Sequence, residues 1–192
     1  LSAGEGNSGF NVRGGGVDQN LMLLDEAVVY NAGHLLGFFS IFNADAIKNT
    51  TLIKGGMPAN YGGRLSSVVD IQMKDGNNQD YSLEGGIGIV ASRLTFQGPI
   101  VKDKSSFIIS GRRTYLFDVA QPFIKNTPFG GTNYYFYDLN LKANYRISQK
   151  DRIFLSGYFG RDVLDLNNPD RDLRFRLNWG NTTSTLRWNH LF

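Results

Sequence analysis

Residues 135–147 read YFYDLNLKANYRI, and the alternation of apolar and polar side chains in this stretch decides the fold class. One face carries Tyr135, Tyr137, Leu139, Leu141, Ala143, Tyr145 and Ile147, and the other carries Asp138, Asn140, Lys142, Asn144, Arg146 and Ser148. Successive side chains of a β-strand point to opposite faces, so the pattern predicts a strand with one apolar and one polar face. Soluble strands have about 5–6 residues, whereas tilted membrane-spanning strands have about 9–11. We therefore predict a strand that crosses a membrane.

Further alternating segments predict about six strands in residues 77–192. One of them has its apolar positions at Phe107, Ile109, Tyr115, Phe117 and Val119. Between Ile89 and Leu94 the apolar residues move from odd to even positions, which predicts a turn at residues 90–92 and two short strands. A similar change at residues 179–181 predicts a bulge within one long strand.

The connections between these strands alternate in length. Residues 98–104 and 148–151 are short connections, whereas residues 120–132 and 162–172 are longer and richer in Pro, Asn and Asp. Short turns on one rim and long loops on the other are typical of outer-membrane barrels. Six strands are too few to close a wide barrel and would leave two bare edges, so we expect the rest of the barrel to be missing.

The upstream half has a different texture, and we place a domain boundary at the turn-forming residues 75–78. Residues 20–30 and 67–73 predict buried strands, and residues 50–53 predict a short strand that ends at Gly55. Residues 42–47 predict a short helix with Asn43 as its cap. The sequence thus predicts a mainly β protein: a small α+β segment (residues 1–76) followed by antiparallel strands of an incomplete transmembrane β-barrel (residues 77–192).

The composition excludes several other classes of protein. The net charge of +3 comes without a basic cluster, which argues against a nucleic-acid partner. The chain has no cysteine, so disulfides and thiolate metal sites are excluded. No stretch approaches the ~18 apolar residues of a transmembrane helix, so any membrane span consists of strands. The chain starts at Leu1 without a signal peptide, and we expect a truncated or processed start.

The motifs of catalysis and cofactor binding are weak. Residues 4–9 (GEGNSG) fit a dinucleotide fingerprint, but no strand precedes them and no helix follows, which indicates a flexible loop. His34 and His190 lie far apart in the sequence, and no Gly-x-Ser-x-Gly motif is present. A calcium site in residues 165–172 is less favoured than a solvated loop. We expect no enzyme activity, no cofactor and no metal.

The basic pairs Arg112–Arg113 and Arg174/Arg176 allow two readings. They could hold an anionic ligand or lipopolysaccharide, or they could be ordinary charges of a barrel lumen. An arginine that faces lipid at mid-membrane would cost about 2–4 kcal/mol, so we expect most of them in the lumen or at a rim. The aromatic run Tyr134–Tyr137 indicates an interfacial girdle rather than a sugar-stacking surface.

The upstream half resembles a known family. The stretches GFNVRGGGVDQNLMLLDEAVVYN (residues 9–31) and DAIKNTTLIKGGMPANYGGRLSSVVDIQMKDG (residues 45–76) look like the plug of TonB-dependent receptors, in which Lys/Arg-Gly, Tyr-Gly-Gly and a Val/Ile-rich strand follow one another. That family usually has Gly at the position of Glu26. Residues 98–115 (GPIVKDKSSFIISGRRTY) are similar to the first turn and strand of receptors from the Bacteroidota.

This resemblance implies a function and a set of plug residues. The implied function is active import of a nutrient (a siderophore, cobalamin, glycan or peptide) across the bacterial outer membrane. The implied partners are TonB with its inner-membrane energising complex, outer-membrane lipid and lipopolysaccharide, and possibly a surface lipoprotein. The structural or gating residues implied for the plug are Arg13, Gly14, Asp25, Lys54, Gly55, Tyr61, Gly62, Gly63 and Arg64.

Two other classes of protein remain open at this point. A soluble β-sandwich that binds glycans would use the same aromatic residues, but its apolar side chains would face inward. A passive porin would share the strands without the plug-like stretch. The importer hypothesis requires the apolar side chains of the second half to face outward, around the first half.

Overall fold

The computed structural model describes residues 12, 14, 16–127, 130–168 and 173–192, so Arg13 and the glycine-rich residues 4–9 lie outside the described residues. The N-terminal module holds η1 (Val17–Gln19), β1 (Asn20–Leu24), β2 (Ala27–Val28), β3 (Gly33–His34), η2 (Leu35–Gly37), β4 (Phe39–Ser40), η3 (Ala44–Ala46), β5 (Ile47–Ile53) and β6 (Ser67–Met73). The second half holds β7 (Ser82–Ile87), β8 (Ala91–Val101), β9 (Ser105–Thr114), α1 (Leu116–Ile124), β10 (Thr132–Arg146), β11 (Asp151–Asn168) and β12 (Leu173–His190).

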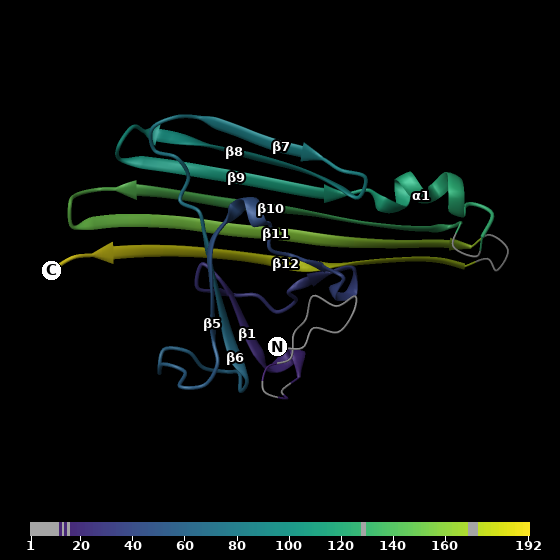
Figure 1. Ribbon diagram of the computed structural model, residues 1–192, viewed down its shortest axis with the longest axis horizontal. Coiled ribbons are helices and arrows are strands. Elements are labelled where there is room, and N and C mark those ends of the chain that lie inside the picture. Colours follow the sequence, from purple (N-terminus) through teal and green to yellow (C-terminus); the bar gives the residue numbers. More distant parts are fainter. Residues whose placement is uncertain (1–11, 13, 15, 128–129, 169–172) are drawn as a thin grey trace.

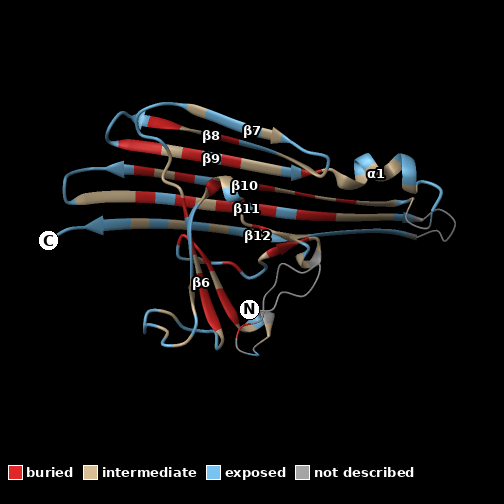
Figure 2. Ribbon diagram, viewed as in Figure 1, coloured by how far each residue is buried: buried red, intermediate tan, exposed pale blue. Residues whose placement is uncertain are grey.

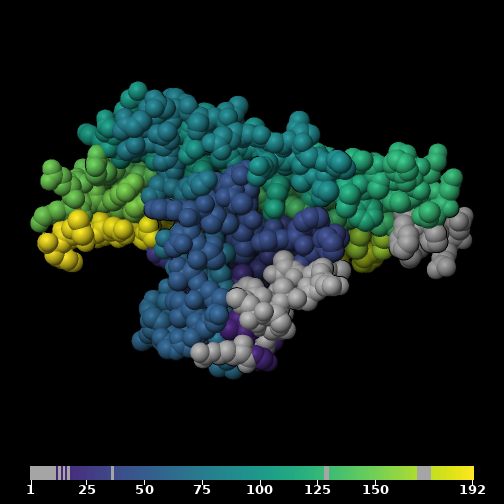
Figure 3. All heavy atoms as spheres, in the orientation of Figure 1, coloured from purple at the N-terminus to yellow at the C-terminus, as the bar shows by residue number. Residues whose placement is uncertain are grey.

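Two sheets make up most of the molecule (Figure 1). Strands β7 to β12 pair antiparallel in their sequence order and form one long six-stranded sheet, which we call the wall. The N-terminal module has a four-stranded sheet of order β2-β1-β6-β5, in which β1 runs parallel to β6. This smaller sheet crosses beneath the wall, and its far end projects away from it (Figures 1 and 3).

The two faces of β10 lie in opposite environments, as the alternation predicts. Leu139 is 46% exposed on the outward face, whereas Asp138, Asn140 and Lys142 are 4%, 3% and 3% exposed on the inward face. Figure 2 shows the buried positions along the middle strands of the wall. A soluble sandwich buries its apolar face and leaves the polar one in water, so this arrangement contradicts that alternative.

The apolar core belongs to the N-terminal module and is closed by the wall. Its buried side chains are Leu24, Val29, Ile41, Ala46, Val69, Ile71 and Met73, joined by Tyr158 of β11. A second, smaller cluster lies on the other face of β1 and β6, where Leu21, Leu23 and Val68 meet the partly buried Tyr61. Side chains of β6 thus enter both clusters, which explains why the apolar residues Val68 and Val69 are adjacent in its sequence.

Several predicted elements are confirmed. Strand β6 spans the predicted residues 67–73, and the parity change near Val90 is a turn between the two strands β7 and β8. The short helix after Phe42 is the 3-10 turn η3, and the side chain of Asn43 accepts a hydrogen bond from the backbone N–H of Asp45. The third predicted strand of the module, β5, starts at Ile47, three residues earlier than expected.

Two predicted strands are wrong because the chain turns within them. Residues 20–30 form a hairpin, in which Asp25 and Glu26 take positive φ angles of 45° and 73° between β1 and β2. The segment that starts at Phe107 leaves the sheet after Thr114 and continues as helix α1. The apolar residues of α1 fit helical as well as strand spacing, and Phe117 packs at 6.4 Å from the ring of Tyr134.

Two expectations about β11 and β12 are also corrected. The two strands pair without a register shift from Asp151 to Asn168, so residues 179–181 form no bulge. The parity changes because the apolar residues near the start of β12, Phe175, Leu177 and Trp179, share the inward face of Tyr134, whereas those near its end face outward. The ring of Trp179 lies 6.3 Å from that of Tyr134. The expected long loop at residues 162–172 is also wrong, because residues 162–168 belong to β11 and pair with β12. Residues 169–172 lie outside the described residues.

No helix among the described residues is long and apolar enough to cross a membrane.

The module's last strand ends at Met73 and the wall begins at Ser82. The domain boundary at residues 75–78 stays a prediction.

Gly76 lies where the chain passes from the module to the wall, against the backbone of β9. Its φ is +82°, and a Cβ at this position would lie 2.3 Å from the carbonyl oxygen of Phe107. A positive φ is strained for any residue with a side chain, and here the close backbone leaves no room for one. The sequence therefore needs glycine at this junction.

We predict that Gly76→Ala lowers the free energy of unfolding by about 2 kcal/mol or more, because backbone strain and overpacking add. Urea unfolding of the purified protein measures this loss. Gly111→Ala is the matched control, since its Cβ would meet no atom closer than 3.7 Å. Equal stability of the two variants would contradict the close approach at Gly76.

Candidate functional site

The interface between the N-terminal module and the wall holds two clusters of buried polar side chains. The first centres on Lys142 of β10. Its Nζ lies 3.1 Å from Oδ2 of Asp25 and 3.2 Å from Oδ1 of Asp75, and it donates a hydrogen bond of 2.9 Å to the carbonyl oxygen of Met73. All three partners lie at the C-terminal ends of β1 and β6: Asp25 directly follows β1, Met73 is the last residue of β6, and Asp75 lies two residues further on. One wall lysine thus holds the ends of both central strands of the module.

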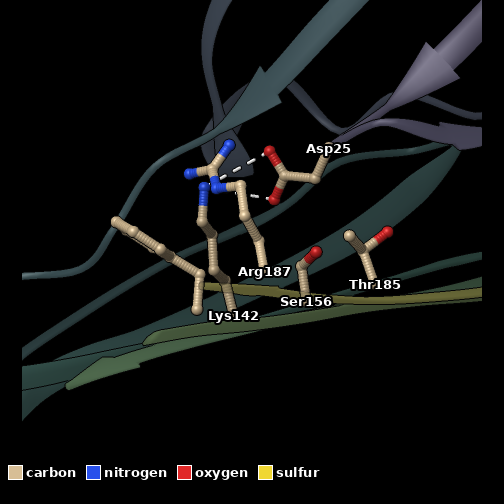
Figure 4. Close-up of a pocket in the computed structure, with 6 residues that line it drawn as sticks. Asp25, Lys142, Ser156, Thr185 and Arg187 are labelled. Carbon is tan, nitrogen blue, oxygen red and sulfur yellow. Dashed lines mark hydrogen bonds and ion pairs between the residues drawn. The ribbon is translucent and has the colours of Figure 1, made fainter. Parts of the chain in front are cut away.

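The position of Asp25 depends on the turn between β1 and β2. Its backbone N–H donates to the carbonyl oxygen of Ile71, and its Oδ1 accepts a hydrogen bond of 3.0 Å from the backbone N–H of Met73. Figure 4 shows Lys142 reaching toward the carboxylate of Asp25, with Arg187 beside it. The cavity at this point measures about 10 Å³, room for about one water molecule, so the pair is almost dry.

The second cluster surrounds His34, a residue of β3 that is 1% exposed. Its Nδ1 lies 2.8 Å from Oδ2 of Asp162, and its Nε2 lies 3.3 Å from Oδ2 of Asp138. The ring stacks on Phe136, with centroids 3.9 Å apart. Both ring nitrogens face carboxylate oxygens, and only the protonated imidazolium can donate hydrogen bonds to both.

The wall side chains around His34 form a connected network. Tyr134 donates its hydroxyl proton to Asp162 and accepts a hydrogen bond of 2.5 Å from the backbone N–H of Leu35. Arg112 lies 2.6 Å from Asp138 and also donates to the carbonyl oxygen of Ser40. The network therefore joins three wall strands to the β3–β4 segment of the module.

The environment of His34 favours its charged form. Burial opposes protonation, but the hydrogen bonds and negative charges of Asp138 and Asp162 outweigh it and raise the pKa of His34 above its ordinary value. The stability that this group contributes is fully present below the ordinary pKa and is lost as the pH rises through the raised one.

Weaker ion pairs complete the interface. Arg93 lies 2.9 Å from Asp45, and Arg187 lies 2.9 Å from Glu26. The Arg93 side chain is 54% exposed, so water screens this pair and its contribution to stability is small. The ion pair with Arg187 gives Glu26 a role beyond the turn between β1 and β2. The positive φ angle of Glu26 would also suit the glycine that the family usually has at this position.

Of the predicted plug residues that the structure describes, only Asp25 belongs to the interface clusters. Lys54, Gly55, Tyr61, Gly62, Gly63 and Arg64 lie in the connection between β5 and β6, at the projecting end of the module. Within it Tyr61 packs on the smaller core cluster, and Arg64 donates to the carbonyl oxygen of Gly63. Gly14 is exposed with a φ of +76°, and Arg13 lies outside the described residues.

Sequence reasoning predicted none of the contacts that His34, Lys142, Asp138 and Asp162 make across the interface. The polar face of residues 135–147 already contained two of them, and a lysine within a polar strand face that packs on another domain calls for a buried carboxylate partner. His34 and Asp162 carried no such pattern, since their contact joins residues 128 positions apart.

The described residues contain no group of three or more His, Asp or Glu side chains suited to a metal ion.

We predict that Lys142→Met lowers the free energy that holds the module against the wall by about 3–5 kcal/mol, because Asp25 is left buried without its counter-charge. Amide hydrogen exchange of β1 and β6 measures the change. The double variant Lys142→Met/Asp25→Asn should recover part of the loss, because it also removes the unpaired charge.

The matched control is Arg93→Gln, which removes the exposed ion pair with Asp45. It should lower the same free energy by at most about 1 kcal/mol. If Lys142→Met costs no more than the control, the buried cluster does not hold the module in place.

We also predict that the free energy that holds the module against the wall falls as the pH rises above the ordinary histidine pKa of about 6.5 and through the raised pKa of His34, because His34 then loses its proton. The measurement is hydrogen exchange at the amide of Leu35, corrected for its intrinsic pH dependence. His34→Gln should abolish this dependence, whereas His190→Gln, at an exposed pair with Asp151, should keep it. A pH dependence that survives in His34→Gln would assign the effect to another group.

Comparison with known proteins identifies a family for the N-terminal part of the chain. The family model of the TonB-dependent Receptor Plug Domain matches residues 2–69. No curated protein sequence matches the chain as a relative.

Two solved structures share the fold. The ferric enterobactin receptor of Pseudomonas aeruginosa, solved as a mutant, is 16% identical with a TM-score of 0.59, and the match covers 92% of this chain and 31% of that receptor. The siderophore receptor of Acinetobacter baumannii is 17% identical with a TM-score of 0.50, and the match covers 77% of this chain and 24% of that receptor. The chain thus spans about a third or less of the length of either receptor.

The predicted family is confirmed, whereas the more local similarity of residues 98–115 to receptors from the Bacteroidota stays a prediction. The family consists of receptors and transporters rather than enzymes. Residues 2–69 thus match the plug of TonB-dependent receptors, and the strands that follow them, with their apolar face turned outward, share the fold of the two solved receptors.

Proposed function

We propose that this chain serves TonB-dependent active import of a nutrient across the bacterial outer membrane. The observation that carries the proposal is the packing of the plug against the polar inner face of the wall, with the apolar outer face left free. A passive pore needs an open lumen, whereas here a folded plug lies against the face that would line it. The partners are then TonB with its energising complex and the lipid of the outer membrane.

The plug interface has the chemistry that movement under force requires. It consists of a few charged contacts and many hydrogen-bonding side chains, and wall residues such as Asn144 and Ser110 donate or accept bonds to the plug. Water can replace such bonds when the plug shifts, so the interface separates at lower cost than an apolar core of equal area.

We further propose that the predicted plug residues act as a structural and gating set. Asp25 supports this through its ion pair with Lys142. The residues of the projecting end, from Lys54 to Arg64, are mostly exposed and lie away from the wall, where they are free to change conformation without breaking the two buried clusters.

The substrate class is proposed from the neighbours. The two solved receptors carry siderophore names, so ferric siderophores come first among the candidates, followed by cobalamin, glycans and peptides. A surface lipoprotein is a further partner that the family resemblance implies.

The first test measures uptake by cells that carry the protein within its whole receptor, with and without TonB. The probes are ⁵⁵Fe-labelled catecholate siderophore, labelled cobalamin, a labelled oligosaccharide and a labelled peptide. We expect accumulation of one probe that is lost without TonB. Accumulation that does not depend on TonB would indicate a passive pore instead.

A second arm fixes the plug to the wall, which is practical because the chain has no cysteine of its own. In Asn43→Cys/Ser110→Cys the two thiols replace side chains that are hydrogen-bonded at 2.8 Å across the interface, and a short reducible linker can join them. We expect import to fall several-fold when they are joined and to recover on reduction.

The matched control is Thr95→Cys/Ser110→Cys, which joins the neighbouring wall strands β8 and β9. The hydroxyl oxygens of Thr95 and Ser110 lie 2.7 Å apart. This bridge should leave import unchanged. Undiminished import through the plug-to-wall bridge would show that this part of the interface stays closed during transport.

A further inference from the structure

The inner face of the wall carries basic side chains on successive levels toward one end of the sheet. The strand register places Lys142 of β10 on one level and Arg187 of β12 two residues further along. Arg146 and Arg152 lie opposite each other two residues beyond that. Two residues of a strand advance by about 6.8 Å, so the levels span about 14 Å. We call these four side chains the basic row.

One aromatic ring brings most of the basic row together. The ring centre of Phe154 lies 5.8 Å from Nζ of Lys142, and it lies 4.8 Å and 4.4 Å from the guanidinium carbons of Arg152 and Arg187. Phe154 is 7% exposed, so its π face attracts the three cations where little water reaches them. Like charges repel one another, and the row therefore needs negative groups close by.

The plug supplies carboxylates to the half of the row that lies nearest to it. Lys142 pairs with Asp25, and Arg187 pairs with Glu26 at 2.9 Å. Asp25 and Glu26 are neighbours in the turn between β1 and β2, and Figure 4 shows Lys142 and Arg187 side by side below Asp25. One short turn of the plug thus neutralises two levels of the row.

The other half of the row has no such carboxylate. Among the residues that the structure describes, neither Arg146 nor Arg152 forms an ion pair. Arg146 donates to the carbonyl oxygen of Asp103, and Arg152 donates to Oδ1 of Asn144 at 2.7 Å. The Nε atoms of Arg152 and Arg187 are buried without a hydrogen-bond partner in the described part of the chain. Guanidinium groups with unused donors are suited to an anion.

The charge of the row changes when the plug's turn moves. Asp75, which also pairs with Lys142, is bound to the wall because its carbonyl oxygen accepts hydrogen bonds from Ser106 and Asn144. Of the ion pairs that the row forms among the described residues, only the one with Asp75 remains once the turn between β1 and β2 has left. A surface with an excess of one charge concentrates ions of the opposite sign, so the uncovered row attracts anions.

The direction of the row within the membrane rests on the proposed function. Arg146 and Arg152 flank the short turn of residues 147–150, at the end of the wall opposite α1 (Figure 1). Outer-membrane barrels keep their short turns on the periplasmic side. A substrate that passes the displaced plug along this side of the lumen therefore meets the row before it leaves the barrel.

We propose that the basic row is an exit site for an anionic substrate, whose oxygens replace the carboxylates of Asp25 and Glu26 once the plug has moved. Guanidinium groups bind carboxylate or phosphate oxygens through paired hydrogen bonds, and successive levels about 7 Å apart suit a small molecule with several acidic groups. In the resting receptor the plug's own carboxylates occupy the site. An uncharged oligosaccharide would gain nothing from it, so the row favours the acidic members of the substrate classes named above.

The test uses the whole receptor, purified in detergent at low ionic strength. The probe is citrate, with its uncharged triethyl ester as the comparison, and isothermal titration calorimetry measures the dissociation constants. The variant Asp25→Asn/Glu26→Gln removes both carboxylates of the turn. We expect it to bind citrate at least about tenfold more tightly than the wild type, because hydrogen bonds between charged groups strengthen binding by about that factor or more.

Two further pairs of substitutions locate the gain. Added to the first variant, Arg152→Gln/Arg187→Gln should abolish the tighter binding of citrate. Arg161→Gln/Arg176→Gln should preserve it, since it removes the same charge from the same two strands but on their outward face.

A milder variant keeps the test valid if the loss of Asp25 loosens the plug. Glu26→Gln alone removes a side chain that is 57% exposed, and it should still bind citrate several-fold more tightly than the wild type. Wild-type affinity for citrate in both carboxylate variants would overturn the proposal. A gain that survives Arg152→Gln/Arg187→Gln, or one that the triethyl ester shares, would overturn it too. Uptake that does not depend on TonB would instead overturn the proposed function and leave the citrate result unchanged.

Discussion

The structure depends on one constraint: the polar face of the wall lies against the plug, so its hydrogen-bonding groups and charges must be matched there. An ordinary β-sheet solves the opposite problem, because it buries apolar side chains and leaves polar ones to water. Here Asp138 and Lys142 are nearly inaccessible, and each finds its counter-charge on the plug or on a neighbouring wall strand. The plug therefore supplies more than bulk, since Asp25 pairs with Lys142 of the wall and His34 pairs with Asp138 and Asp162.

The fold was largely predictable because it rests on periodicity. The alternation in residues 135–147 indicated both the strand and the direction of its apolar face, and the Val/Ile-rich residues 67–73 indicated the buried strand of the plug. The errors came where the apolar pattern fits two structures. Phe117 and Val119 suit a helix as well as a strand, and Trp179 points inward at a level where the wall is no longer lined only by polar groups.

The site was less predictable, because its contacts join distant parts of the chain. Asp25 was selected through the family resemblance, but nothing in the sequence pairs it with Lys142, 117 residues away. Conversely, Lys54 and Arg64 match the family's pattern and yet lie in the projecting connection rather than at the wall. The family's motif indicates residues of the plug, whereas the strand register of the wall determines which of these residues contact a wall side chain.

The parallel pairing of β1 with β6 has a mechanical consequence. The chain enters β1 at Asn20, where Ser67 donates a hydrogen bond to its side chain, and leaves it at Asp25, where Lys142 ties the strand to the barrel. Tension applied from the N-terminal side therefore stretches β1 between a loaded end and an anchored end. Its hydrogen bonds to β6 lie across the direction of the pull, in a row along the strand, and share the load in shear instead of breaking one after another. The same residues that dock the plug would then set how much force it withstands before it yields.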